Sequence, residues 1–168
     1  MHMKLDRTDR KILEALQENG RVTNVELARG AGISAPPCLR RVRSLEEDGY
    51  ITGYYAALNA KALGYEVTVF AHVRLSSHSE PDIHAFEQQI NGWGCVREGH
   101  MLAGTSDFLL KIVARDWNDY QKFLTTRLLK ASSVTHVKSS LSLRTNKFQP
   151  GIPFDEGTVA ENRQDTAV

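Results

Sequence analysis

The 168-residue chain has little cysteine and almost no net charge (+1). Its two cysteines, Cys38 and Cys95, form no CxxC pair, which argues against a disulfide scaffold or a structural zinc site. No apolar run reaches 18 residues, so we expect no membrane-spanning helix and no membrane partner. The N-terminus is charged and lacks the apolar core of a signal peptide, which favours a cytoplasmic protein.

Motifs of common catalytic and cofactor sites are also missing. The sequence has no P-loop, no GxGxxG and no nucleophile–base pattern, and its histidines lack a metal-ligand spacing such as HxxxH. We therefore expect no enzyme activity, no cofactor and no metal. Hydrophobic residues make up 41% of the chain and charged residues 24%, which is typical of a globular protein with a substantial core.

The first fifty residues predict three short helices. Asp6 with Asp9, and Thr23 with Glu26, have the spacing of capping boxes, in which two side chains close the first helical turn. Ser34 is expected to cap the third helix. Because only "AGI" separates the second and third helices, their spacing is that of a helix-turn-helix.

The third helix concentrates positive charge in a nearly neutral chain. From Arg21 to Leu45 there are five arginines and one glutamate, a net charge of +4. A basic recognition helix places its N-terminal residues at base edges, and its arginines bind phosphates or guanine. The alternative is a solvated face on an ordinary three-helix bundle. The residues predicted to contact double-stranded DNA are Ser34, Pro36, Arg40, Arg41, Arg43 and Ser44.

The opposite face of this helix is apolar. Cys38, Leu39, Val42 and Leu45 are expected to point into the core. A buried free cysteine most often serves as a small hydrophobic residue. A redox- or metal-responsive regulator that uses Cys38 and Cys95 stays open as an alternative.

After residue 65 the pattern changes to strands. In "VTVFAHVRL" every second residue is apolar, which is typical of a strand with one buried face. "SEPDIHAFEQQI" and "DWNDYQKFLTTRLLK" read as amphipathic helices, while "CVREGHMLA", "DFLLKIVA" and "VTHVKSSLSLRT" read as strands. The resulting order, β-α-β-β-α-β, is that of a ferredoxin-like domain.

The stretch "HMLAGTSDFLLK" holds the turn between the two middle strands. Most GTSD sequences are simple hairpin turns, but this one also carries the groups that a free amino acid needs. Gly104 permits a backbone turn that other residues resist. Thr105 offers a hydroxyl, Asp107 can accept a hydrogen bond from an α-ammonium, and Met101 belongs to a hydrophobic wall for a side chain.

These motifs together resemble those of one family. LDxxDxxIL, NGR, LA, GxS and CxxRVxxLExxGxIxGY in the first half, and "HMLAGTSDFLLKIVA" with the closing strand in the second, are similar to the Lrp/AsnC (feast/famine) regulators. The resemblance covers residues 4–148 and is nearest the leucine-responsive branch. It implies a sequence-specific DNA-binding transcriptional regulator whose assembly or DNA affinity responds to a small amino acid.

The resemblance also implies an α+β architecture in four parts. A three-helix (winged) helix-turn-helix domain would occupy residues 1–52 and an extended linker residues 53–65. A ferredoxin-like βαββαβ domain, called RAM, would occupy residues 66–148, and residues 149–168 would form a disordered tail. Regulators of this family form dimers that commonly assemble into octamers, so we expect a homo-oligomer of that kind.

The family's effector loop, which binds amino acids at contacts between dimers, is similar to the one in this chain. The matching positions are Gly104, Thr105 and Asp107, and Ser139 matches a hydroxyl that faces the ligand from a neighbouring subunit. The implied effector is leucine or another apolar amino acid. Ser106 departs from the family, since an aromatic residue often stands there. A small-molecule enzyme on a ferredoxin-like domain is the least favoured alternative.

Overall fold

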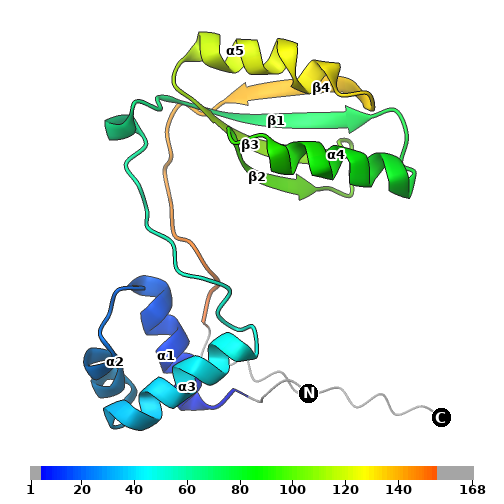
Figure 1. The fold of residues 1–168 in the computed structure, drawn as a ribbon. Coiled ribbons are helices and arrows are strands. Elements are labelled where there is room, and N and C mark those ends of the chain that lie inside the picture. Colours follow the sequence, from blue (N-terminus) through cyan, green and yellow to red (C-terminus); the bar gives the residue numbers. More distant parts are fainter. Residues whose placement is uncertain (1–4, 155–168) are drawn as a thin grey trace, which may run out of the picture. The chain divides into compact units, whose positions relative to one another are not determined.

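The structure, a computed structural model, describes residues 5–154 and divides them into two compact units. The described residues of the first unit are 5–57 and 148–154, and the second unit spans residues 58–147. The first unit contains α1 (Arg7–Glu18), α2 (Asn24–Ala31) and α3 (Ala35–Glu47) (Figure 1). The second contains β1 (Val67–Leu75), α4 (Glu80–Gly92), β2 (Val96–Met101), β3 (Phe108–Ala114), α5 (Trp117–Thr126) and β4 (Val134–Leu141), with short 3-10 helices at Lys61–Leu63 and Leu128–Lys130.

The helices of the first unit begin at the predicted residues. Both capping boxes are formed, Asp6 with Asp9 at α1 and Thr23 with Glu26 at α2. Ser34 is the residue before α3, but its side chain makes no capping hydrogen bond, so that part of the prediction was wrong. Prolines in the first turn of α3 reduce the need for a cap because they have no N–H to satisfy.

The core of the first unit gathers one face from each helix. Ile12, Leu27, Cys38 and Leu45 are each at most 4% exposed. Leu39, predicted to point inward, is 41% exposed. The inward positions of α3 are Cys38 and Leu45, which are buried, and Val42, which is partly buried. They are spaced four and three residues apart, and a residue one step along the helix is rotated by about 100°. The helical period therefore turns Leu39 away from the core.

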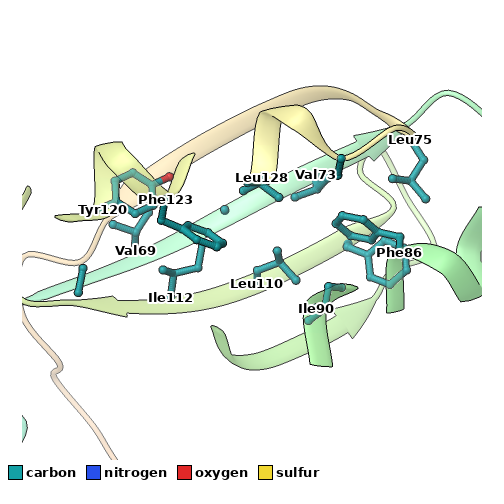
Figure 2. Packing of buried hydrophobic residues seen from close by; sticks show 14 residues of the cluster. Val69, Val73, Leu75, Phe86, Ile90, Leu110, Ile112, Tyr120, Phe123 and Leu128 are labelled. Carbon is teal, nitrogen blue, oxygen red and sulfur yellow. The ribbon is translucent and has the colours of Figure 1, made fainter. Parts of the chain in front are cut away.

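The second unit is a four-stranded antiparallel sheet in the order β2-β3-β1-β4, covered on one face by α4 and α5 (Figure 1). This confirms the predicted α+β class and the ferredoxin-like order. Buried and less buried residues alternate along the two inner strands. Figure 2 shows side chains of the buried set, among them Val73, Leu110 and Ile112, packed against Phe86 of α4 and Tyr120 of α5.

The connection between β2 and β3 is longer than the predicted tight hairpin turn. It runs from Leu102 to Asp107 and is closed by a hydrogen bond of 2.8 Å from the Leu102 N–H to the Asp107 carbonyl. Gly104 does not have a positive φ, and a Cβ atom there would meet nothing within 4 Å. The conformational reason offered for this glycine was therefore wrong, since the backbone at this position accepts other residues.

The segment after the sheet returns to the first unit. The Ile152 N–H donates to the side-chain oxygen of Gln17, and the Gln17 amide donates to the Ile152 carbonyl, both at 2.8 Å. The remainder of the expected disordered tail, residues 155–168, lies outside the described residues. Among the helices formed by residues 5–154, none is both long and apolar enough to cross a membrane.

Candidate functional site

The outward face of α3 carries the residues predicted to contact DNA. Ser34, Pro36, Arg40 and Arg43 are all exposed, and Ser44 is half-buried. Neither Arg40 nor Arg43 forms an ion pair with another residue of the range 5–154. Two unpaired guanidinium groups, one helical turn apart, give this face a positive charge and donors suited to phosphate or guanine.

Arg41 points elsewhere and has an internal partner. Its Nη1 atom lies 2.7 Å from an oxygen of Asp6 and 2.6 Å from an oxygen of Asp9, whose side chain is only 3% exposed. Both hydrogen bonds raise the pKa of Arg41, and the one to Asp9 has the larger effect. The Asp9 backbone N–H, followed by Arg41, lowers the pKa of Asp6. Arg41 thus ties α3 to the start of α1, a structural contact that its predicted DNA role did not include.

Leu39 joins the exposed face of α3 and was missed as a candidate. It lies next to Arg40 in sequence and four residues before Arg43, so the three side chains are neighbours on the helix surface. An apolar side chain beside basic ones is suited to contact a thymine methyl group in the major groove. The four-and-three spacing of Cys38, Val42 and Leu45, which excludes Leu39, is the sequence signal that identifies it.

The predicted effector loop, residues 102–107, is fastened to β1 by two side chains. Asp107 accepts from the Leu75 N–H at 2.7 Å, and its other oxygen lies 2.9 Å from the His78 Nε2 atom. Arg74 donates to the Thr105 carbonyl at 2.7 Å. Because the Asp107 carboxylate is engaged within the chain, a ligand ammonium would have to share it or displace His78.

The remaining effector candidates are divided between two places. Met101 is 57% exposed at the end of β2, and Gly104 and Thr105 are exposed in the loop. Ser139 belongs to β4 and lies opposite Ala71 of β1. Its hydroxyl is hydrogen-bonded to that of Tyr120 in α5. Ala71 is buried beneath the helices, so Ser139 faces that side of the sheet and does not meet the loop within one chain.

Both cysteines lie in environments that disfavour the reactive thiolate. Cys38 is fully buried and Cys95 is half-buried. Burial raises the pKa of each thiol, which lowers the fraction of nucleophilic thiolate at neutral pH. Within residues 5–154 no group of three or more His, Cys, Asp or Glu side chains is placed to hold a metal ion.

Thiol alkylation tests the redox alternative directly. We expect iodoacetamide at neutral pH to modify Cys95 slowly and Cys38 only after unfolding, because a buried thiol is both protonated and inaccessible. Mass spectrometry of the native and the urea-unfolded protein measures the two rates. Rapid native labelling of Cys38, accompanied by loss of DNA binding, would restore a cysteine-based sensor.

Two family models match the two halves of the chain. A winged helix-turn-helix DNA-binding model matches residues 5–52, and an Lrp/AsnC ligand-binding-domain model matches residues 68–152. The first match contains all three helices of the first unit. The second contains the whole sheet, both covering helices and the 102–107 loop, apart from the first residue of β1.

Similar proteins agree with both matches. The leucine-responsive regulatory protein of Rhizobium meliloti is 48% identical, over 88% of this chain and 94% of the relative. The transcriptional regulator AzlB of Bacillus subtilis is 36% identical, over 93% and 99%. A Neisseria meningitidis transcriptional regulator solved with L-Met is 34% identical, with a TM-score of 0.84 over 89% of this chain and 96% of that one. The chain therefore belongs to the Lrp/AsnC family, and it is a DNA-binding transcriptional regulator rather than an enzyme.

Proposed function

We propose that the outward face of α3 binds double-stranded DNA sequence-specifically, through Ser34, Pro36, Arg40, Arg43 and Ser44. The observation that carries this proposal is the pair of exposed arginines without ion-pair partners among residues 5–154. Guanidinium groups on a recognition helix supply both phosphate contacts and bidentate bonds to guanine. We assign Arg41 to the support of this helix, because Asp6 and Asp9 occupy its guanidinium.

The 102–107 loop is the proposed receptor for a small amino acid. Met101, Gly104 and Thr105 offer accessible surface there, while Asp107 carries the carboxylate. The R. meliloti relative is named for leucine and the N. meningitidis regulator was solved with L-Met, which supports leucine or another apolar amino acid. A neighbouring subunit would supply Ser139. This requires a homodimer and a higher assembly, for which we propose the octamer, acting in the cytoplasm.

The proposed response is a shift between assembly states. A ligand shifts such an equilibrium only as far as its affinities for the two states differ. The loop offers a physical basis for that difference, because Asp107 and Arg74 hold it against β1. A ligand whose ammonium competes for the Asp107 carboxylate would loosen the contact with His78 and change how the loop meets another subunit.

Asp107→Asn tests the receptor role without removing the support of the loop. The asparagine side chain keeps an acceptor for the Leu75 N–H but loses the charge that attracts an ammonium. The effector is first identified by a thermal-shift screen of the twenty amino acids. We expect Asp107→Asn to weaken the apparent affinity for that effector, measured by thermal shift, at least tenfold. DNA binding of the variant in a gel shift should be retained. An effector response equal to that of the wild type would refute the assignment.

A further inference from the structure

The outward face of α3 carries one large apolar side chain among its basic ones. Leu39 is 41% exposed and lies in the first half of the helix, which begins at Ala35. Pro36 lies three residues before it and Arg43 four residues after it, so both are its neighbours on the helix surface. These three residues and Arg40, all of them exposed, form what we call the exposed strip of α3.

A side chain of α2 holds the start of α3 in addition to the turn between the two helices. Asn24, the first residue of α2, donates from its Nδ2 atom to the Ala35 carbonyl at 2.9 Å. Ala35 is the first residue of α3, so this hydrogen bond spans the turn from Gly32 to Ser34. Two attachments restrict the rotation of α3 relative to α2 more than the turn alone would. The exposed strip is therefore presented in one orientation.

The place where Leu39 is exposed gives that exposure a meaning. A single leucine elsewhere on a surface needs no explanation, because apolar atoms make up much of any protein surface. The N-terminal half of a recognition helix, however, enters the major groove and contacts base edges. Docking there removes Leu39 from water and places it against a base pair. A hydrogen-bonding group of the base that faced Leu39 would lose its water partner without a replacement, which costs binding free energy.

The major groove offers one apolar group that suits such a side chain. Adenine, guanine and cytosine present hydrogen-bonding groups there, whereas thymine also presents its C5-methyl group. The neighbouring Arg40 and Arg43 form no ion pair with another residue of the range 5–154, so both are available to phosphate or guanine. The polar contacts of the exposed strip are thus supplied by the arginines, and the apolar contact is left to Leu39.

We propose that Leu39 is a specificity-determining residue that contacts the C5-methyl group of one thymine in the DNA bound by each α3. The proposal rests on the DNA contact proposed above for α3 and adds a base that the helix prefers. Leu39 is next to Arg40 in sequence and one helical turn before Arg43. The thymine therefore adjoins the base pairs or phosphates that these arginines contact. The arginines bind DNA without this thymine, but less tightly.

Replacing single thymines by deoxyuridine tests the contact, because uracil differs from thymine only in lacking the C5-methyl group. The starting DNA is a fragment selected by the wild-type protein. We expect one of these replacements to weaken wild-type binding in a gel shift about fourfold, the effect of leaving one methylene-sized group unburied. Leu39→Ala should bind the thymine and the deoxyuridine fragment equally. Leu129→Ala, which removes the same side chain from an exposed position of the second unit, should keep the fourfold loss.

Leu39→Gln provides a second test, in a selection of DNA fragments from a random pool. Glutamine is a good helix former at an exposed position, and its amide pairs with adenine rather than with a methyl group. We expect the preference for thymine at the identified position to be lost, while the other positions of the selected sequence stay the same. A retained preference for thymine would overturn the proposal, and so would deoxyuridine replacements that affect the wild type and Leu39→Ala alike.

Arg40→Ala separates this proposal from the DNA contact on which it rests. If Arg40→Ala weakens binding while Leu39→Ala keeps the wild-type response to every deoxyuridine, α3 contacts DNA and the thymine contact is overturned. If neither variant alters DNA binding, both proposals fail. A loss at one thymine that disappears in Leu39→Ala supports both, because only a side chain in the groove can sense that methyl group.

Discussion

Arg41→Ala is expected to lower the free energy of unfolding of the first unit by about 2 kcal/mol, the scale of a lost hydrogen bond to a buried charged group. The substitution leaves the Asp9 carboxylate, 3% exposed, without the guanidinium that lies 2.6 Å from it. Breaking a fully buried ion pair costs about 3–5 kcal/mol. We expect a smaller loss, because the Arg41 side chain is 37% exposed and solvent screens its charge.

The chain supplies its own internal control for this measurement. Both tryptophans, Trp93 and Trp117, lie in the second unit, so their fluorescence in urea reports that unit alone. Far-UV circular dichroism also follows the three helices of the first unit. We expect Arg41→Ala to shift the dichroism transition and leave the fluorescence transition in place, while Arg40→Ala shifts neither. A dichroism transition at the wild-type position would remove the structural role assigned to Arg41.

Lowering the pH should weaken the ion pair between Arg41 and Asp6, because it protonates the Asp6 carboxylate. The Asp9 backbone N–H and Arg41 hold the pKa of Asp6 below its ordinary value of 3.8. A carboxyl group whose pKa is depressed in the folded state contributes stability that is fully present above the ordinary value. That contribution is lost as the pH falls below about 3.8 through the lowered pKa. The Arg41→Ala difference in stability should therefore shrink in that acidic range.

The sequence predicted local features more completely than contacts between distant segments. The Asp6–Asp9 spacing specifies a capping box, because both partners lie within one helical turn. It does not specify that Arg41, 32 residues beyond Asp9, completes the cluster. Adjacent arginines look alike in sequence, and only the packing of α3 against α1 decides that Arg40 faces outward while Arg41 faces Asp9.

The effector region shows the same division. Asp107 was identified by residue type and position, but its bond to the Leu75 N–H depends on how the loop closes onto β1. The register of β1 against β4 pairs His72 with Lys138 across 65 intervening positions. Strand register over such a distance is set by matching of the buried faces, and single-strand alternation does not contain that information.

Arg40→Ala is expected to weaken DNA binding about tenfold, with little change in folding, because Arg40 is exposed and has no ion-pair partner within residues 5–154. An arginine bonded to guanine contributes about 1–3 kcal/mol of binding free energy, and this loss would relax specificity at one base pair. An arginine bonded to phosphate contributes evenly across sequences, and its removal lowers the slope of log affinity against log salt by about one.

Gel shifts can distinguish these two roles. They compare a DNA fragment selected by the wild-type protein with point variants of that fragment. The salt concentration is varied from about 50 to 200 mM, the range over which phosphate contacts lose much of their affinity. Arg115→Ala is the matched control, since it removes the same charge from an exposed position of the second unit. We expect that control to bind as the wild type does. Affinity and salt slope both unchanged in Arg40→Ala would show that the outward face of α3 does not contact DNA. A uniform loss with a smaller slope would place Arg40 on a phosphate, and a loss confined to some sequences would place it on a base.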